Sequence, residues 1–265
     1  ISEPYTFYKR FFSGKSDNKG GGTVVNPINQ SGKKSLLQKI SLWVRANMFI
    51  PDPKRSWIAP SVKYLLGYLE ENRVDAIVST GPPHSMHLIA KELHRKTGIR
   101  WVADFRDPWT RIFYFKHLPT TSWAKKRHEK LELAVVSEAD AVVSVTNQMT
   151  QEFATLLNSG VENSRLYTVC NGYDEDDFDS VEVNPDRHFT LLHTGLFSAD
   201  GNPVRLWKVL AGISSENKDF AEDLRIRLVG KVDREVISSI VESGLSHNLE
   251  NLGYLPHSDI PGLQK

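Results

Sequence analysis

From residue 74 onward, short apolar runs alternate with stretches of helical periodicity, and no other feature restricts the fold as much. The apolar runs cover residues 76–78, 101–103, 141–145, 166–169, 189–192 and 226–229. The helical patterns lie near residues 84–97, 123–138, 147–158, 203–216 and 233–243. A strand, a helix and a second strand at this spacing form a βαβ unit. The sequence therefore predicts an α/β protein with parallel sheets whose faces are covered.

The alternation stops once, and this interruption predicts two domains. Residues 174–186 hold seven acids and few core candidates, so residues 176–187 are interpreted as an acidic connector. Residues 1–175 then form the later part of a first Rossmann-like domain, and residues 188–265 the first part of a second. Residues 13–35 are rich in Gly, Ser, Asn and Lys without hydrophobic periodicity, which predicts a flexible loop.

The composition excludes several classes of protein. Of the 265 residues, 40% are hydrophobic and 25% charged, which is typical of a globular protein and not of a collagenous or disordered one. The single cysteine, Cys170, cannot form a disulfide within the chain, which fits a reducing compartment. No stretch approaches the roughly 20 apolar residues that cross a bilayer, and the start lacks the pattern of a signal peptide. We therefore expect a cytoplasmic protein.

The charge is unevenly distributed along the chain. The total is +1, yet residues 1–60 hold ten lysines and arginines against three acids, a net charge of +7. Aromatic and basic residues near positions 36–57 are candidates for peripheral contact with an anionic membrane at its inner face. The alternative is a helix near residues 36–48 that packs its Leu and Trp side chains on the domain. No pattern typical of a nucleic-acid-binding module is present.

The first motif, STGPPHS at residues 79–85, follows a predicted strand. Ligands of parallel sheets bind beyond the carboxyl ends of the strands, where helix N-termini offer free N–H groups. Gly81 lets the backbone turn, and His84 and Ser85 would lie at that edge. The alternative is a stiff turn with a surface histidine. A metal is not expected, because His84, His87 and His94 lack further ligands at suitable spacing.

The second motif, VADFRDPW at residues 102–109, also follows a predicted strand. Two carboxylates and a guanidinium within four residues lose solvation unless they pair or meet a polar ligand. One interpretation is an Asp–Arg ion pair that closes the loop. The other is a polar cluster of Asp104, Arg106 and Asp107 that contacts a sugar hydroxyl or the reacting carbon.

Further candidates lie near the domain junction and in the second domain. Asn171 and Gly172 form a turn signal directly before the presumed hinge. Gly195 follows the first strand of the second domain and Gly230 follows the next one. A glycine at such a place allows close approach of a phosphate, and the N-terminus of the following helix favours an anion. The candidate phosphate contacts are Gly195, Gly230, Arg205 and Lys231.

The order STGPPHS, VADFRDPW, NGYD and HTG resembles glycosyltransferase family 4, a group of two-domain GT-B enzymes, over about residues 60–265. The resemblance implies two Rossmann-like domains, each incomplete here. It implies a nucleotide-sugar donor held in a cleft mainly by the second domain, and a glycan or lipid-linked acceptor held by the first. The implied reaction moves the sugar to an acceptor hydroxyl with retention, without a metal or cofactor, in polysaccharide or glycolipid synthesis.

The resemblance also implies roles for the candidate residues. The transition state resembles an oxocarbenium ion, so charge near the anomeric carbon matters more than a nucleophile. Asp107 is the first candidate for that catalytic role, followed by the other polar groups near it: His84, Asp104, Arg106. Gly81 and Ser85 belong to the acceptor-side loop. The basic residues Arg205 and Lys231 would stabilise the donor diphosphate beside Gly195 and Gly230.

Three departures separate this sequence from the family pattern. No strand with a Gly-rich loop precedes Ser79, and Gly201 stands where a basic residue is usual before Asn-Pro. Glu242 and Glu250 have the spacing of the Glu-x7-Glu motif, but they lie on either side of a predicted helix end, so we interpret them as a chance match. We therefore expect the middle of a longer enzyme, inactive alone. The alternatives are a non-catalytic module that binds a glycan or partner, and a sugar-nucleotide epimerase of related fold.

Overall fold

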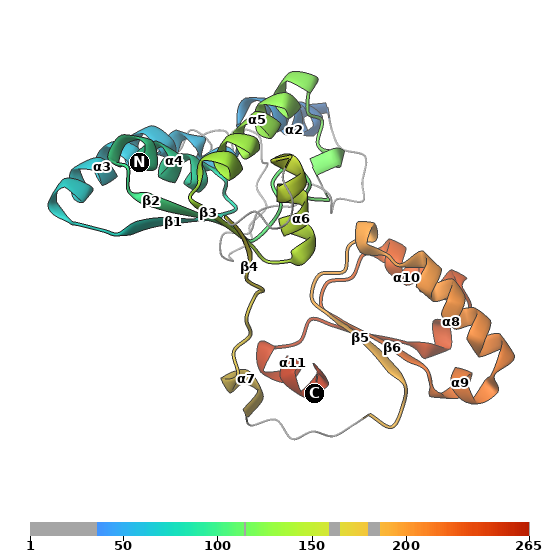
Figure 1. Cartoon of the computed structure of the whole chain (residues 1–265). Helices are drawn as coiled ribbons and strands as arrows, with labels where there is room; N and C mark the ends of the chain where they lie inside the picture. Colours follow the sequence, from blue (N-terminus) through green and yellow to red (C-terminus); the bar gives the residue numbers. More distant parts are fainter. Residues whose placement is uncertain (1–35, 114, 159–164, 180–185, 265) are drawn as a thin grey trace. The chain divides into compact units, whose positions relative to one another are not determined.

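The computed structural model describes residues 36–113, 115–158, 165–179 and 186–264 (Figure 1). The chain divides into two compact units, residues 1–171 and residues 172–265, and each is described by itself. The loop predicted at residues 13–35 lies outside the described residues. Of the predicted connector, the structure describes a short helix, α7 (Asp176–Asp179), which belongs to the second unit.

Unit 1 is built on a parallel sheet of four strands in sequential order. The strands are β1 (Ala76–Gly81), β2 (Arg100–Phe105), β3 (Ala141–Ser144) and β4 (Leu166–Thr168). The helices that connect them are α4 (Ser85–Thr97), α5 (Ser122–Glu138) and α6 (Asn147–Leu156). Right-handed crossovers between strands in sequential order place all connecting helices on one face. The predicted βαβ repeat is therefore confirmed.

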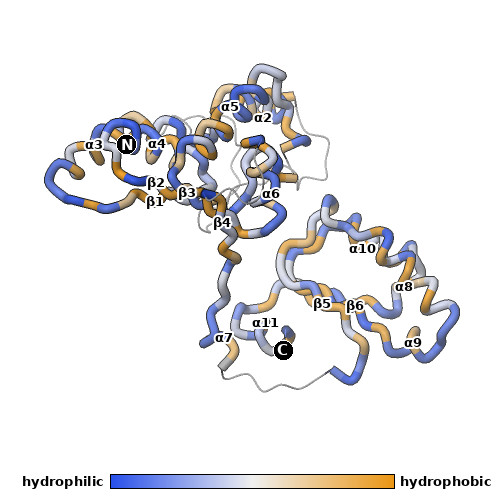
Figure 2. The backbone as a smooth tube through the Cα atoms, in the orientation of Figure 1, coloured by the Kyte–Doolittle hydropathy of each residue, from blue (hydrophilic) through white to orange (hydrophobic). Residues whose placement is uncertain are grey.

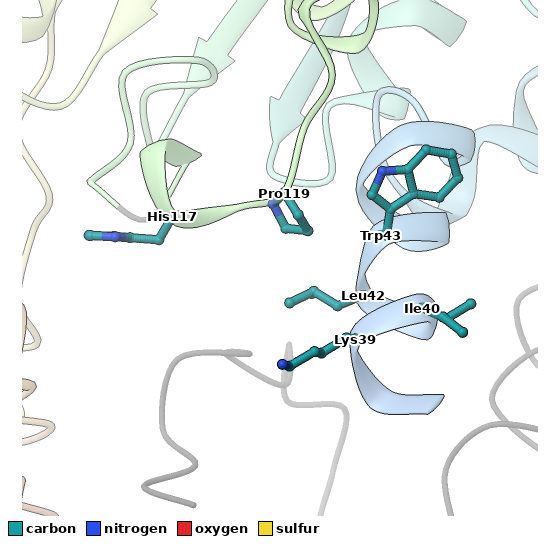
Figure 3. A pocket seen from close by; sticks show the side chains of 6 residues that line it. All are labelled: Lys39, Ile40, Leu42, Trp43, His117 and Pro119. Atoms are coloured by element: carbon teal, nitrogen blue, oxygen red, sulfur yellow. The ribbon is translucent and has the colours of Figure 1, made fainter. Parts of the chain in front are cut away.

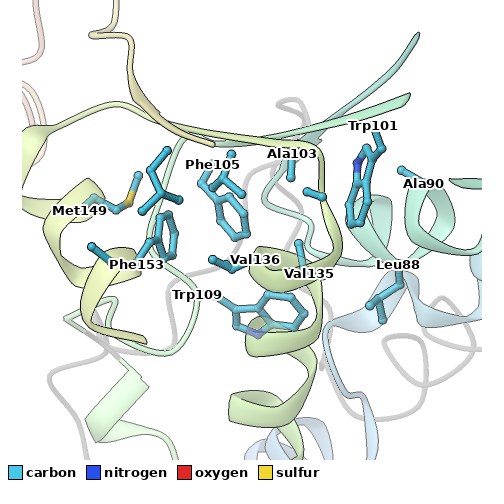
Figure 4. Close-up of a cluster of buried hydrophobic side chains, with 14 residues drawn as sticks. Leu88, Ala90, Trp101, Ala103, Phe105, Trp109, Val135, Val136, Met149 and Phe153 are labelled. Carbon is cyan, nitrogen blue, oxygen red and sulfur yellow. The ribbon is translucent and has the colours of Figure 1, made fainter. Parts of the chain in front are cut away.

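The core of unit 1 lies between this sheet and its helices (Figure 4). Trp101, Ala103 and Phe105 alternate along β2 and are fully buried. They pack against Val135 of α5 and Phe153 of α6. On the opposite face Val78 is exposed, and Val102 and Val143 are half-buried. The sequence predicted a sheet covered on both faces, and this core lies on one of them.

Helices that precede the sheet form an outer layer. They are α2 (Leu36–Met48), the 3-10 helix η1 (Pro53–Trp57) and α3 (Ile58–Glu71), and a second 3-10 helix, η2 (Phe115–His117), lies before α5. Val62 of α3 packs on Ile89 and Leu93 of α4. Asp52 begins η1 because its carboxylate accepts the Lys54 amide at 2.8 Å. Of these elements, α2 agrees with the helix considered near residues 36–48, whereas the 3-10 helices η1 and η2 were not predicted.

Unit 2 repeats the topology with three parallel strands. They are β5 (Thr190–Thr194), β6 (Arg225–Val229) and β7 (Leu249–Gly253), in sequential order. The helices are α8 (Val204–Glu216), α9 (Lys218–Asp223), α10 (Arg234–Glu242) and α11 (Ile260–Gln264), with short 3-10 turns η3 (Ala199–Gly201), η4 (Ser246–Asn248) and η5 (His257–Asp259). Strands β5 and β6 contain apolar residues, which are orange in Figure 2. Ile226 and Leu228 of β6 pack on Trp207 of α8 and Ile240 of α10.

The other side of the unit 2 sheet carries charges. Arg227 on β6 pairs with Glu250 on β7 at 2.7 Å and with Asp186 at 3.2 Å. Arg225 lies 3.8 Å from Glu250. In both units, no helix among the described residues combines the length and the apolar character that crossing a bilayer requires.

Candidate functional site

The two motifs of unit 1 meet at the carboxyl edge of its sheet. Gly81 ends β1 and pairs with Phe105, the last residue of β2. The Arg106 amide donates to the Gly81 carbonyl at 3.0 Å, and the Arg106 guanidinium donates to the Pro82 carbonyl at 2.6 Å. Arg106 therefore joins the loop after β2 to the loop after β1.

His84 is buried at this edge, with 8% of its surface exposed. Its ring stacks on Trp109, with centroids 4.5 Å apart and planes within 1° of parallel. Burial lowers the pKa of His84 well below its usual value, and the nearby His87 and His128 lower it further. The imidazole is therefore neutral near pH 7, and its Nδ1 atom has no hydrogen-bond partner within the described part of the chain. The interpretation as a surface histidine is wrong.

Gly81 lies against two imidazole rings. Trp101 Nε1 donates to Ser79 Oγ at 2.8 Å, and Ser79 Oγ lies 2.8 Å from His87 Nδ1. The Ser79 hydroxyl and His87 Nδ1 thus share one hydrogen bond, and Nε2 of His87 has no partner in the described structure. A Cβ atom at Gly81 would lie 2.6 Å from that Nε2 and 3.1 Å from His84 Nδ1. Gly81 is therefore required by close packing against the two rings, and not only because it lets the backbone turn.

The charged residues of the second motif do not pair with one another. Asp104 accepts a hydrogen bond from Thr80 Oγ1 at 2.7 Å, while Arg106 is bound to backbone carbonyls. Asp107 makes no hydrogen bond or ion pair with the described residues. Partial burial raises the pKa of Asp107, and the positive charge of Arg106 opposes that rise. The predicted Asp–Arg ion pair is not formed, so one unpaired carboxylate remains at this edge.

The segment after Asp107 is fixed to α5. Trp109 Nε1 donates to His128 Nδ1 at 3.0 Å, and the Thr110 hydroxyl donates to the buried Glu132 carboxylate. Burial raises the pKa of Glu132, and the hydrogen bonds from Thr110 oppose that rise. Sequence reasoning missed these anchors. Their signal was a histidine and a glutamate four residues apart on the buried face of a predicted helix.

The N-terminus of α4 is occupied by a carboxylate of the chain itself. Asp52 accepts hydrogen bonds from the Ser85 amide and the Ser85 hydroxyl, both at 2.7 Å. Ser85 is fully buried. The amide that we expected to be free for a ligand thus has a partner 33 residues away in the sequence. Asp52 was also missed, because no local pattern connects it with Ser85.

In unit 2, three glycines line the carboxyl edge of the sheet. Gly195 follows β5 with φ of 112°, Gly230 follows β6 with φ of 109°, and Gly253 ends β7 with φ of 68°. The Gly195 amide donates to the Val229 carbonyl at 2.8 Å, and the Gly230 amide donates to the Gly253 carbonyl at 2.6 Å. A Cβ atom at Gly230 would lie 2.3 Å from the Gly195 carbonyl oxygen. We call these residues the glycine row; sequence reasoning found its first two members.

Two predicted basic residues lie on the elements that follow this row. Lys231 is exposed directly after Gly230, and its carbonyl accepts the Phe197 amide at 3.0 Å, which ties together the loops after β5 and β6. Arg205 is exposed in the first turn of α8. Asn202 supports that turn, because its side chain accepts from Trp207 Nε1 at 2.7 Å and donates to Ser239 at 2.8 Å.

The remaining candidate residues lie at the boundary between the units and in unit 2. Asn171 and Gly172 are exposed, and the division between the units falls between them. Glu250 is held by Arg227 on the sheet, whereas Glu242 ends α10, so the two glutamates serve different elements. Among the residues that the structure describes, no three His, Cys, Asp or Glu side chains come together as ligands of a metal ion.

Several solved structures are similar to this chain, at low sequence identity. A UDP-forming α,α-trehalose-phosphate synthase from Burkholderia xenovorans matches with a TM-score of 0.53 and 11% identity, over 97% of this chain and 62% of that one. The lipopolysaccharide outer core galactosyltransferase WaaB in its apo form matches with a TM-score of 0.48 and 15% identity, over 78% of this chain and 51% of that one.

A UDP-GlcNAc 2-epimerase from Methanocaldococcus jannaschii matches with a TM-score of 0.44 and 14% identity, over 80% of this chain and 58% of that one. The chain thus spans between half and two thirds of the length of these three structures. No curated protein gives a significant match.

Family membership rests on the sequence. The profile described as Glycosyltransferase Family 4 matches residues 30–177, which is more than half of the chain. This range contains both motifs that meet at the edge of the unit 1 sheet, and the two parallel sheets agree with the Rossmann-like domains of the GT-B fold. By this match the chain belongs to Glycosyltransferase Family 4.

Proposed function

We propose that this chain takes part in the transfer of a sugar from a nucleotide-sugar to an acceptor hydroxyl, with retention of configuration. The acceptor is a glycan or a lipid-linked glycan of a cell-surface polysaccharide or glycolipid. The observation that carries the proposal is the edge of unit 1, where the loop after β2 holds a carboxylate, Asp107, that has no partner among the described residues. Sugar hydroxyls can donate hydrogen bonds to such a group.

The glycine row of unit 2 is the proposed diphosphate site. Glycines without Cβ atoms let the oxygens of a phosphate approach the backbone closely. Lys231 lies next to this row and Arg205 lies at the start of α8. In the proposal these two cations neutralise the diphosphate, so that no metal or cofactor is required.

Asp107 is the proposed catalytic carboxylate. In the reaction, the bond between the anomeric carbon and the diphosphate oxygen breaks, and the diphosphate leaves with the electron pair. The acceptor oxygen bonds to the anomeric carbon from the same side, and its proton passes to the departing diphosphate. A fixed negative charge stabilises the positive charge that develops on the sugar. Arg106 and Trp109, each bound to its own partner, hold the loop on either side of Asp107.

His84, Asp104 and Gly81 have supporting roles in this proposal. His84 stacks on Trp109 and so supports the loop that carries Asp107. Asp104 acts through Thr80, to which it is bound. Gly81 keeps the two imidazoles in contact with the backbone.

Binding of nucleoside diphosphates tests the donor half of the proposal. Titration calorimetry with UDP, GDP, ADP and dTDP should give binding of at least one of them. Lys231→Ala and Arg205→Ala should each weaken it by roughly ten- to a hundredfold, the size expected when one charged hydrogen bond is lost. The matched control is Lys218→Ala, an exposed lysine of α9.

Calorimetry, together with product analysis after incubation with a nucleotide-sugar, separates the alternatives. A chain that binds none of the four nucleotides is not a donor-binding protein, which favours the non-catalytic module. Conversion of a nucleotide-sugar without any acceptor favours the epimerase. Transfer that depends on an acceptor supports the proposal.

A further inference from the structure

Helix α2 presents apolar side chains to solvent. Leu36, Ile40 and Trp43 follow one another at the i, i+4, i+7 spacing of one helix face, and they are 74%, 46% and 46% exposed. Leu37 and Met48 extend this surface and are also exposed. In a globular protein such a stripe normally packs against a core. The stripe of α2 is therefore a surface that a partner is expected to cover.

The helix is fixed to unit 1 at its C-terminal end. Only Ala46 and Asn47 of α2 are buried. The Asn47 side chain donates to the Pro119 carbonyl at 2.9 Å and accepts the Thr121 amide at 2.7 Å. Because these bonds join α2 to the segment that leads into α5, the apolar stripe has a defined place next to that segment.

A groove of about 490 Å³ extends the apolar surface from α2 to the segment before α5 (Figure 3). It is lined by Lys39, Ile40, Leu42, Trp43, His117 and Pro119. In the close-up, Leu42 and Lys39 point across the groove toward the side of His117 and Pro119. The apolar surface therefore extends from α2 onto the adjoining loop, and Lys39 lies at the border of the groove.

The surroundings of the stripe are strongly basic. Residues 36–57, from α2 through η1, hold four lysines and arginines against one acid, a net charge of +3. Residues 115–127 hold four and no acid, a net charge of +4. The whole chain carries only +1, so this part of unit 1 concentrates positive charge. In the first turns of α5, the exposed Trp123 stands beside the exposed Lys125, Lys126 and Arg127.

We propose that α2 and residues 115–127 form a peripheral binding surface for an anionic lipid bilayer. Trp and aliphatic side chains on a helix enter the boundary between headgroups and acyl chains, while lysines and arginines beside them attract anionic headgroups. Lysine stems can also lie on apolar surface while the ammonium group stays in water. The combination of an apolar stripe and a local basic excess matches this chemistry. The proposal does not depend on the transfer reaction.

Co-sedimentation with vesicles tests whether this surface binds an anionic bilayer. The full chain is mixed with vesicles of phosphatidylglycerol and phosphatidylcholine, and separately with vesicles of phosphatidylcholine alone. We expect binding to the anionic vesicles that decreases as salt is raised, because exposed charges are screened. We expect at least tenfold weaker binding to phosphatidylcholine alone.

Two double variants test the two parts of the surface. Ile40→Ser with Trp43→Ser removes the stripe, and Lys125→Glu with Lys126→Glu reverses two charges. Each should weaken binding to anionic vesicles about tenfold or more. The matched controls in unit 2 are Val209→Ser with Ile213→Ser, an exposed apolar pair on α8, and Lys218→Glu with Arg234→Glu. Circular dichroism checks that all variants fold.

The vesicle-binding results of the test and control variants decide whether the proposal holds. Loss of binding in both test variants with normal binding in both controls supports the proposal. The proposal is overturned if the wild type does not sediment with anionic vesicles, or if the test variants bind as well as the controls. In those cases another part of the chain or a protein partner covers the stripe. Because no nucleotide or sugar is present, this result is independent of the test of transfer.

Discussion

The carboxyl edges of the two sheets have the same topology but different chemistry. In unit 1 the edge is built from side chains: buried imidazoles and indoles held by long-range hydrogen bonds, and a carboxylate, Asp107, that has no partner among the described residues. In unit 2 the edge is built from backbone, with a glycine at the end of each of the three strands. The first arrangement fixes side chains in place, whereas in the second Gly230 is required by its close contact with the Gly195 carbonyl and by its positive φ. The comparison teaches that one topology can build its carboxyl edge from side chains or from the main chain.

The largest effect on stability is expected when a Cβ atom is added to the glycine row. Gly230→Ala should lower the free energy of unfolding by about 2–5 kcal/mol, because the new atom meets a backbone oxygen at 2.3 Å and the residue has a positive φ. Urea unfolding followed by circular dichroism measures the effect. Gly212→Ala is the control, since its Cβ would meet nothing within 4 Å. An equal loss in both variants would contradict the packing of the glycine row.

A smaller loss is expected at the corresponding position of unit 1. Gly81→Ala should cost about 1–3 kcal/mol, because the new Cβ meets side chains that can shift in part. Gly67→Ala in α3 is the control and should be neutral or stabilising by up to about 1 kcal/mol. If Gly81→Ala is as stable as wild type in urea, the imidazoles do not pack on Gly81 as described.

The smallest expected effect is the change in the free energy of unfolding per pH unit, and it is specific to unit 1. Burial lowers the pKa of His87 from 6.5 to about 3, with Arg106 contributing, and the pKa of His128 to about 4. Since the unfolded chain binds these protons first, stability falls as pH drops below 6.5. The loss is about 1.4 kcal/mol per pH unit for each such histidine until its folded pKa is reached.

The variant His87→Gln isolates one histidine. Asp107 and Glu132 have raised pKa values and act in the opposite direction, so the difference between variant and wild type is the informative quantity. Urea unfolding between pH 7 and pH 4.5 should show a shallower loss in the variant. Equal slopes would show that His87 takes up its proton in the folded protein as readily as in the unfolded one.

Much of the fold could be predicted because the signals are local. The apolar runs that became β1, β2 and β6 are separated by helical patterns of ordinary length, so the βαβ order follows from periodicity. Gly195 and Gly230 were also predicted from their places after strands. Their reason for being glycine, a positive φ and a close backbone contact, appears only in three dimensions.

The site in unit 1 was only partly predictable. STGPPHS and VADFRDPW marked the correct edge, but the partners of their residues come from elsewhere in the chain. Asp52 reaches Ser85 from η1, and His128 reaches Trp109 from α5. An isolated sequence carries no pattern for such pairs. For this reason His84 was open to interpretation as a surface residue, although stacking on Trp109 buries it.

The most direct test of the proposed function uses the full-length protein that contains this chain, and it measures donor binding and sugar transfer side by side in wild type, Asp107→Asn and Lys231→Ala. Asp107→Asn should keep its affinity for the nucleoside diphosphate and lose about a hundredfold or more in transfer rate, because the carboxylate acts on the transition state. Lys231→Ala should lose affinity. Transfer by Asp107→Asn at the wild-type rate would contradict the assignment of the catalytic carboxylate.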